Sequence, residues 1–291
     1  MKRAVLSVVI PGILGAALLC APRPLLAQPA SGGAVQPAIA APVVAAAPAL
    51  DSEQIEAFLL NASIVKSKKI GKGVTGSLVA TLTDGRLTHD AHIQHVNIAR
   101  HEERAFKDHF RYNIAAYRMA RLLGLANVPV SIERVVDQAP AAVTWWVDGV
   151  LMDEEERLKR EKDKTAPAWP RVRTVGYQQV MRVFDELIAN DDRNAGNQLW
   201  TKDGTLWLID HTRAFRLQRA LKKAGRLERC DRAVWTALQG LTLESVTAAV
   251  GTTLTKDEIQ AVVVRRNLIV KQFTKMIESR GEPAVLFSLT P

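Results

Sequence analysis

Five stretches rich in β-branched residues lie between residues 63 and 147, and turn residues separate several of them. Asp84-Gly85 is a dipeptide that tight hairpin turns prefer, and a second turn is expected from Asp137 to Pro140. The alternation of apolar and polar positions therefore predicts strands at 63–70, 77–82, 88–96, 128–136 and 142–147.

Apolar residues recur at helical spacing outside these stretches, and capping or terminating residues bound several of the segments. Asp51 or Ser52 can cap the first helix, and Gly124 ends the second. Thr255 with Glu258 forms a capping box that opens a long helix near the C-terminus. Helices are predicted at 52–60, 106–123, 177–189, 234–238, 243–250 and 255–281.

The C-terminal half is mainly helical, with one exception. A short apolar strand is predicted at 205–209, after the turn Lys202-Asp203-Gly204. Strands with one helix, followed by helices with one small hairpin, are typical of a two-lobed α+β protein. We predict a small strand-rich N-lobe with one main helix at about 51–147, and a helical C-lobe with a small catalytic hairpin at about 148–291.

The first 27 residues have the pattern of an export signal. Lys2 and Arg3 precede an apolar run over 4–19, and the segment ends in a small residue, Ala27, where a signal peptide would be cleaved. The run is shorter than the roughly 20 residues that span a bilayer, so cleavage is expected rather than a stable membrane span. Lipid attachment at Cys20 is disfavoured because bulky Leu19 precedes it.

Residues 28–50 consist almost entirely of Ala, Pro, Val, Gly and Gln, which predicts a linker. The domain that follows, 51–291, is expected to be periplasmic or secreted and to be a monomer. Cys230 would be the single cysteine left after cleavage, so no internal disulfide is expected.

The amino-acid composition changes these predictions of fold and location little. With 47% apolar and 24% charged residues over 291 positions, the chain can bury a sizeable core. The formal charge of +9 could attract an anionic partner. Basic and acidic residues are interleaved, however, and no basic arm with aromatic residues is present, so no nucleic-acid partner is expected.

One loop and the strand after it carry the residues with the clearest chemistry. Asp192 and Asn197 stand five residues apart on the loop after the helix at 177–189, and Asp210 ends the strand at 205–209. In phosphoryl transfer one carboxylate orients or deprotonates the attacking hydroxyl, while an amide oxygen and another carboxylate hold metal ions on the phosphates. Asn, Asp and Gly also serve ordinary turns, which is the alternative interpretation of the loop.

This segment resembles the catalytic core of atypical kinases, among them the HipA-type toxin kinases, the Golgi secretory-pathway kinases and the CotH spore-coat kinases, and more distantly the phosphatidylinositol kinases. They share an Asn-x-Asp-Arg-x-x-x-Asn loop, here Asn190 to Asn197, and a strand ending in Ile-Asp, here at Asp210. The resemblance implies a protein-kinase-like fold with Asp192 and Arg193 as catalytic-loop residues. Asp192 would be the catalytic aspartate, Arg193 and Asn190 would support the loop, and Asn197 and Asp210 would bind the metal.

The same resemblance implies a nucleotide site between the lobes. Gly71, Gly73 and Gly76 resemble the loop that covers the phosphates, where bare backbone amides can approach the nucleotide, although a plain hairpin would also suit them. Trp145 and Trp146 fall where the hinge would contact the adenine. Adjacent strand residues face opposite ways, so we expect one of them, Trp146, to line the pocket.

The resemblance extends weakly over 55–273 and departs from the kinase pattern at two matched positions. Gln94 stands where these kinases carry a lysine on the phosphates, and Asn113 stands where a helix glutamate pairs with it. A glutamine and an asparagine can bond each other, so the paired loss is physically consistent. It removes one positive charge, which Lys72 or Lys107 could supply from elsewhere.

The function predicted from these residues is an exported phosphotransferase that moves a phosphoryl group from ATP, with Mg or Mn, to a hydroxyl of a protein, sugar or lipid. A pseudokinase or nucleotide-binding scaffold is the first alternative, and transfer of another group such as AMP is a second. A metal-binding module is a third, because five of the six histidines crowd into 21 residues. These histidines are His89, His92, His95, His101 and His109.

Overall fold

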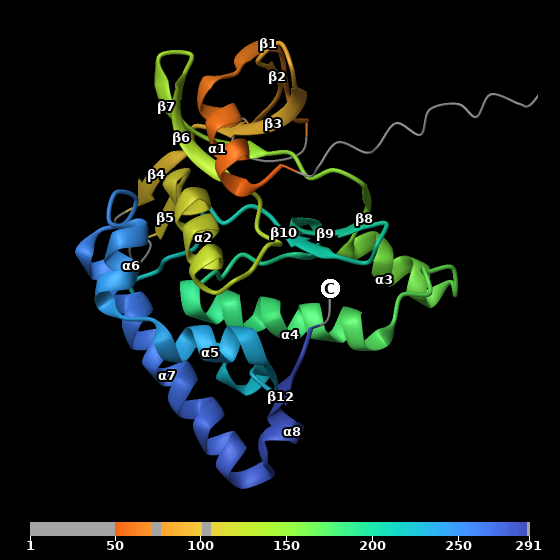
Figure 1. The fold of residues 1–291 in the computed structure, drawn as a ribbon, viewed down its shortest axis with the longest axis vertical. Helices are drawn as coiled ribbons and strands as arrows, with labels where there is room; N and C mark the ends of the chain where they lie inside the picture. The colour runs from red at the N-terminus through yellow and green to blue at the C-terminus, as the bar shows by residue number, and fades with distance from the viewer. Residues whose placement is uncertain (1–49, 72–76, 101–105, 290–291) are drawn as a thin grey trace, which may run out of the picture. The chain divides into compact units, whose positions relative to one another are not determined.

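The computed structural model describes residues 50–71, 77–100 and 106–289, which belong to one compact unit, Ala49–Pro291. An antiparallel five-stranded sheet in the order β1-β2-β3-β7-β6 forms the N-terminal lobe, and helices form most of the C-terminal lobe (Figure 1). The predicted α+β composition is confirmed. The five strands are β1 (Ser63–Lys69), β2 (Leu78–Thr83), β3 (Thr88–Gln94), β6 (Ser131–Val136) and β7 (Ala139–Trp145).

Both predicted hairpin turns are present in this sheet. β2 and β3 pair up to Thr83 opposite Thr88, and the Asp84 carboxylate accepts hydrogen bonds from the two backbone N–H groups that follow Gly85. β6 and β7 are joined by Asp137 and Gln138, whose φ angles of 51° and 63° are those of a two-residue turn with both central residues left-handed. The turns fix the register, and the two strands bury Ala91, Ile93 and Gln94 of β3 and residues 141–143 of β7.

Two helices pack on this sheet. Asp51 caps α1 (Ser52–Asn61) in a capping box with Gln54, and Phe58 and Leu59 are buried beneath the helix. Most of α2 (Arg111–Leu122) is buried, since it contacts β6 and β7 on one side and α6 on the other. α2 therefore connects the sheet to the C-terminal lobe.

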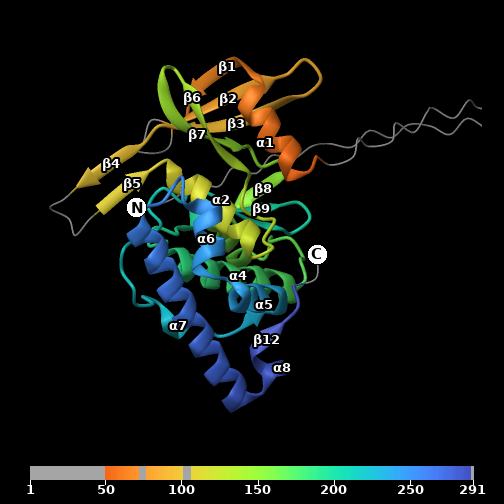
Figure 2. The ribbon, with the colours of Figure 1, turned by 60° about the vertical axis from the view of Figure 1, so that its left-hand side comes forward.

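The prediction of a helix from residue 106 was wrong over its first turn. Phe106–His109 is a strand, β5, paired antiparallel with β4 (Asn97–Arg100), and the helix begins at Arg111. His109 N–H donates to Thr212 O over 2.8 Å, which gives β5 a partner outside the hairpin. Figure 2 shows the two strands beside the main sheet. Non-local hydrogen bonds have thus overridden the local helical pattern.

A three-stranded sheet, ordered β10-β9-β8, lies between the N-terminal sheet and α4 (Figure 1). The predicted strand at 205–209 is β10 (Leu206–Leu208), and it forms a hairpin with β9 (Gln198–Thr201). β8 (Val150–Asp153), which follows directly after the link between the lobes, joins the other edge of β9. The loop that carries the predicted catalytic residues is therefore held between α4 and a sheet.

Helices surround this small sheet. α4 (Arg171–Ile188) carries the predicted apolar stripe and ends at Ala189, which takes a left-handed φ of 49°. Thr255 and Glu258 form the predicted capping box of α7. The remaining elements of this lobe are α3 (Glu154–Lys162), α5 (Arg232–Gly240), α6 (Leu243–Val250), α7 (Lys256–Arg280), α8 (Glu282–Val285) and the parallel pair β11 (Cys230–Asp231) and β12 (Leu286–Phe287).

Within the described part of the chain, no helix combines the length and apolar character that crossing a bilayer requires. The predicted export signal at 1–27, the linker at 28–50 apart from its last residue, and Gly73 and Gly76 of the glycine loop lie outside the described residues.

Candidate nucleotide and metal site

A cleft of about 410 Å³ opens between the two lobes and brings together residues far apart in sequence. Its volume falls in the range of small-molecule sites. Its lining combines apolar side chains with a few polar groups, a composition that suits a nucleotide base next to phosphates. Residues that line it include Ile70, Ser77, His92, Gln94, Asn113, Trp146, Asn197, Ile209, Asp210 and His211.

The loop after α4 is shaped by Arg193, whose side chain is only 4% exposed. Its guanidinium donates to the Asp185 carboxylate on α4 and, through Nη1, to Asn197 O at 2.9 Å and Ile209 O at 2.7 Å. Because these partners occupy its donors, Arg193 positions the loop, the supporting role that the resemblance implies. Asn190 completes the support by donating to Asp185 Oδ1 over 3.0 Å.

Asn197 and Asp210 line the same cleft. Ile209 N–H donates to Asn197 O over 3.2 Å, which brings the end of β10 to the end of the loop. The Asn197 side chain has no hydrogen-bond partner among the described residues, and the Asp210 carboxylate accepts from Thr212 Oγ1 over 3.1 Å. A carboxylate and a free amide oxygen on one cleft wall fit the hard oxygen ligands that Mg²⁺ or Mn²⁺ takes.

Asp192 lies on the same loop, but it is not among the residues that line the cleft. Its side chain is 45% exposed, and Oδ2 accepts from Arg213 Nη1 over 3.1 Å. Arg213 follows Asp210 by three residues. The carboxylate of Asp192 is thus tied, through Arg213, to the segment that follows Asp210. It also remains open to solvent, where an acceptor could reach it.

The two residues that the resemblance matches to the kinase lysine and glutamate are in contact. Asn113 Nδ2 donates to Gln94 Oε1 over 2.5 Å, and both side chains are buried in the cleft. The expected bond between them is confirmed. Asn113 Oδ1 also accepts the backbone N–H of His211 over 2.8 Å, so the neutral pair ties β3 and α2 to the residue after Asp210.

No Lys or Arg of the described chain lines the cleft. Lys107 was a candidate for the missing charge, but its ammonium pairs with Glu258 of α7 over 2.9 Å. Lys72 lies outside the described residues. Gly71 is described and exposed, with open space around it, and Ile70 N–H bonds Ser77 O over 2.9 Å at the base of the loop.

Both tryptophans at the link between the lobes border the cleft, which corrects the expectation that only one could. β7 ends at Trp145, so the strand alternation does not extend to Trp146. Trp145 also stacks on His89 at a ring-centroid distance of 3.4 Å, and Trp146 is 40% exposed. Trp146 therefore lines an exposed part of the cleft.

The histidines do not converge on a metal in the described chain, where no three His, Cys, Asp or Glu side chains are placed to hold one. His89 bonds Asp148, His95 bonds Pro140 O, and His101 lies outside the described residues. His92 faces the cleft, where burial lowers its pKa and the charge of Asp210 opposes that effect. The structure therefore gives no support to the histidine metal site in this part of the chain.

A buried histidine and a buried cysteine are unsuited to acid-base or nucleophilic work. Burial, and then the charge of Arg193, hold the pKa of His211 well below its usual range. Burial raises the pKa of Cys230 to about 12, so its thiol stays protonated.

Sequence reasoning missed three residues around this site. Asp185 is the anchor of Arg193, and Arg213 and Asp108 form a second pair at 2.8 Å, in which Asp108 is buried and Arg213 is partly exposed. Asp185 could have been noticed as a carboxylate on the apolar helix at 177–189. Asp108 and Arg213 lie 105 positions apart, and nothing in the local pattern indicates their contact.

Comparison with known proteins gives neighbours in structure alone, since no family model and no curated sequence matches the chain. A hydra Fam20 solved with sugar has a TM-score of 0.62 and 14% identity, over 81% of this chain and 92% of that one. The Helicobacter pylori proinflammatory kinase CtkA has a TM-score of 0.53 and 11% identity, over 76% of this chain and 98% of that one. The chain has the two-lobed fold of the atypical kinases. At these identities the likeness establishes the fold, and the chemistry depends on the residues described above.

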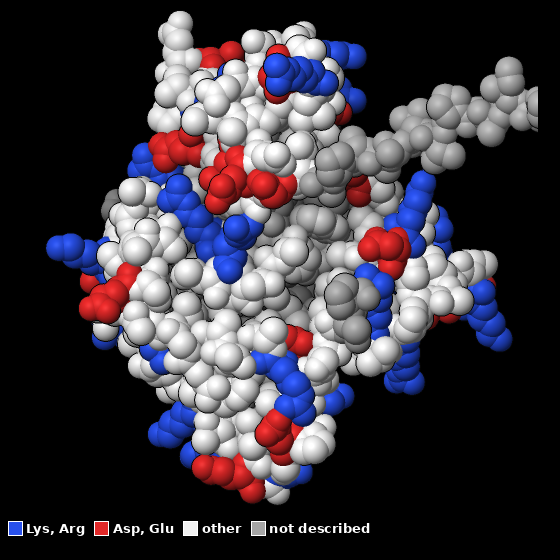
Figure 3. Space-filling model, viewed as in Figure 1, with Lys and Arg blue, Asp and Glu red and all other residues white. Residues whose placement is uncertain are grey.

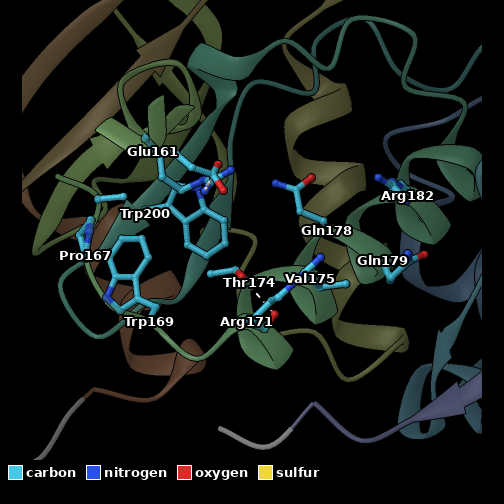
Figure 4. A pocket seen from close by; sticks show the side chains of 12 residues that line it. Glu161, Pro167, Trp169, Arg171, Thr174, Val175, Gln178, Gln179, Arg182 and Trp200 are labelled. Carbon is cyan, nitrogen blue, oxygen red and sulfur yellow. Dashed lines mark hydrogen bonds and ion pairs between the residues drawn. The ribbon is translucent and has the colours of Figure 1, made fainter. Parts of the chain in front are cut away.

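A second pocket of about 550 Å³ lies outside the kinase-like cleft, between α3, the start of α4 and β9. Figure 4 shows Trp169 and Trp200 on one side of it and Gln178 and Arg182 on the other. The indole N–H groups of both tryptophans already donate within the protein, to Lys202 O and to Glu154. The aromatic pair therefore anchors the hairpin to the helices and is not part of the candidate site.

Charge on the visible surface is mixed. Figure 3 shows Lys and Arg side chains spread over one face, interleaved with Asp and Glu, rather than gathered into a stripe. This agrees with the interleaving seen in the sequence.

Proposed function

We propose that this chain is an exported phosphotransferase that binds ATP and a divalent ion in the cleft and transfers a phosphoryl group to a hydroxyl. The observation that supports this most directly is the placement of Asn197 and Asp210 on one cleft wall, with Asp192 tied to the same segment. The likeness in fold to kinases supports assigning these three residues the roles that the motif implies.

In this proposal Asn197 and Asp210 would hold Mg²⁺ or Mn²⁺. A bound divalent ion would neutralise charge on the donor phosphates. Gln94 and Asn113 would contact the nucleotide without adding charge, and the glycine loop from Gly71 would cover the phosphates. The cleft would exclude water from the base on its apolar side, where Trp146 borders the opening.

Asp192 would act on the acceptor. Its exposed carboxylate would accept the hydrogen bond of the attacking hydroxyl and take its proton as the new phosphorus–oxygen bond forms and the bond from the terminal phosphorus to the bridging oxygen breaks, releasing ADP. Arg193 would hold the loop in place through its hydrogen bonds to Asp185 and to the backbone. Because Asp192 is 45% exposed, the body of a large acceptor could stay outside the cleft while its hydroxyl reaches the terminal phosphate.

The acceptor is a hydroxyl of a protein, sugar or lipid. The hydra Fam20 structure contains a sugar, which makes sugar hydroxyls the first class to test. Export rests on the signal pattern at 1–27. N-terminal sequencing of the mature protein from cell fractions tests it, with Gln28 expected as the first residue.

A non-catalytic scaffold is the second candidate function. It is favoured by one observation, the neutral Gln94–Asn113 pair in a cleft that no described Lys or Arg lines. Such a protein would bind nucleotide without turnover.

Transfer of labelled phosphate from ATP, with Mg²⁺ or Mn²⁺, tests the proposed function. Wild-type protein is expected to label an acceptor or itself, and Asp192→Ala and Asp210→Ala are expected to reduce labelling by at least about 100-fold. Asp257→Ala is the matched control because Asp257 is exposed in the first turn of α7. Labelling that neither site substitution reduces would contradict the proposal, and nucleotide binding without labelling would favour the scaffold.

A further inference from the structure

The segment that follows Asp210 is held by the N-terminal lobe at three successive residues. His211 N–H donates to Asn113 Oδ1, and Thr212 O accepts from His109 N–H, each over 2.8 Å. Arg213 Nε then donates to Asp108 Oδ2, also over 2.8 Å. The conformation of this segment is therefore set by β5 and α2, not by the C-terminal lobe alone.

Arg213 bridges two carboxylates that differ in environment. Asp108 on β5 is buried, with 2% of its side chain exposed, whereas Asp192 on the catalytic loop is 45% exposed. Hydrogen bonding to Asp108 raises the pKa of the Arg213 guanidinium, so it stays charged. The planar guanidinium can address both carboxylates at fixed angles, which a lysine ammonium cannot.

Of the two carboxylates that Arg213 bridges, the buried one, Asp108, is the one held in place. Oδ1 of Asp108 is buried and has no hydrogen-bond partner among the described residues, so Arg213 provides the contact that offsets the burial of this charge. No residue of the described chain donates to the other carboxylate oxygen of Asp192, Oδ1, which would serve a partner from outside. The arrangement fixes one oxygen of the exposed carboxylate and leaves the second for an acceptor.

We propose that Arg213 is a positioning residue that orients the carboxylate of Asp192 toward the acceptor hydroxyl, with Asp108 as its anchor. This inference depends on the proposed phosphotransfer. It makes the β4–β5 hairpin part of the catalytic apparatus, because a shift of β5 would move Asp108, then Arg213 and then the base. Arg213 acts here on Asp192 and does not contact the donor phosphates.

The variant that tests this claim is Arg213→Gln combined with Asp108→Asn. Changing both residues removes the bridge without leaving a buried charge unpaired. We expect kcat to fall roughly 100-fold, because a misplaced catalytic group costs about that much. The KM for ATP and the Kd for Mg·ADP are expected to stay within about twofold of wild type, since ground-state nucleotide binding is not involved.

Two further variants make the result specific. Arg213→Lys keeps the charge but not the planar fork, so its kcat is expected to lie between wild type and the double variant. Arg111→Gln with Glu133→Gln is the matched control: it removes a half-exposed Arg–Glu pair in the N-terminal lobe and is expected to leave kcat unchanged. Circular dichroism and thermal unfolding confirm that each variant folds, and Arg213→Lys carries the test if the double variant does not.

The outcomes separate this inference from the proposed function. An active wild type with unchanged kcat in the double variant overturns the positioning role alone. A raised Kd for Mg·ADP with unchanged kcat also overturns it, because Arg213 would then contact phosphates. A wild type that transfers no phosphate to any acceptor overturns both proposals.

Discussion

Asn113 has two partners in the cleft, and each of its amide atoms is used. Nδ2 donates to Gln94 and Oδ1 accepts the backbone N–H of His211. Replacing a lysine–glutamate ion pair with two amides keeps the connection between β3 and α2 without burying charge. The Asn113 side chain also fixes the backbone beside Asp210. Asn113 therefore contributes both to stability and to the geometry of the candidate site.

Asn113→Ala is expected to lower the free energy of unfolding by about 3 kcal/mol, because it leaves the side-chain carbonyl of Gln94 and the backbone N–H of His211 buried without partners. Urea denaturation followed by circular dichroism measures this. Asn61→Ala is the control, since the Asn61 side chain bonds Ala57 O on an exposed helix surface, and about 0.5 kcal/mol or less is expected. Equal losses in the two variants would contradict the account.

At the residue scale, the sequence predicts groups whose roles follow from a short motif. Asp192, Asn197 and Asp210 stand at fixed spacing on one loop and hairpin, and the Gln94–Asn113 contact followed from matching two positions to an ion pair. Arg213, Asp108 and Asp185 were not predicted. Their partners are set by how β5, α4 and the loop pack, and no local pattern carries that information.

Glu258 shows how one side chain joins several elements. It lies at the third position of α7, where it completes the capping box with Thr255. Oε1 also accepts from Lys107 Nζ of β5 at 2.9 Å and from Tyr112 Oη of α2 at 2.5 Å. Burial raises its pKa, but these hydrogen bonds more than offset that effect and leave the pKa below the ordinary value of 4.5.

Glu258→Gln is expected to lower the free energy of unfolding by about 3 kcal/mol at pH 7, because a buried, hydrogen-bonded carboxylate is lost and the partly exposed ammonium of Lys107 loses its partner. A folded-state pKa below 4.5 means that the carboxylate contributes fully above that pH and that its contribution is lost as pH falls through the lowered value. Urea denaturation of wild type and variant should therefore converge as the pH falls below about 4.5.

Glu133→Gln provides the comparison, because Glu133 forms a pair with Arg111 in which both side chains are more than a third exposed. A loss of less than about 1 kcal/mol is expected at pH 7. A constant difference between wild type and Glu258→Gln from pH 7 to pH 3 would contradict the assigned role of the carboxylate.

At the element scale, the sequence correctly predicted the turns and helix starts that carry local signals, such as turn dipeptides and capping residues. Asp84-Gly85, Asp51 and the Thr255–Glu258 box each mark a turn or a helix start correctly. β4, β5, β8 and β9 are strands of four residues, too short to show a clear alternation. β8 pairs with β9 from a distant part of the sequence, and β11 and β12 pair across more than 50 positions. α3 was missed because it has few apolar residues and is stabilised by surface ion pairs such as Glu156–Arg160.

The cleft joins the two lobes, so its occupancy should affect the stability of the whole domain. Its lining comes from β3, α2, β7 and the β9–β10 hairpin, which belong to different parts of the sequence. The fold, and a nucleotide site between the lobes, were predictable from the order of elements and the motif together. The shape and the full lining of the cleft were not, because they depend on how the lobes pack.

Mg·ATP at about 100 times its Kd is expected to stabilise the protein by about 2.7 kcal/mol, because it binds only the folded state. For a domain of this size that is a rise in Tm of roughly 5–10 °C. ATP with EDTA should give a clearly smaller rise, and Asp210→Asn should remove the effect of the metal. Differential scanning fluorimetry measures all three. An equal rise with and without Mg²⁺ would contradict the assignment of Asp210 as a metal ligand.

The central claim is that this cleft transfers the terminal phosphoryl group of ATP, and ³¹P NMR of a reaction with Mg²⁺ tests it most directly. The account predicts ADP together with a new phosphoester signal, and neither product with Asp192→Ala. Formation of AMP-linked product and pyrophosphate would show that another group is transferred. ATP left intact by wild-type protein that binds it, across protein, sugar and lipid hydroxyls, would contradict the claim.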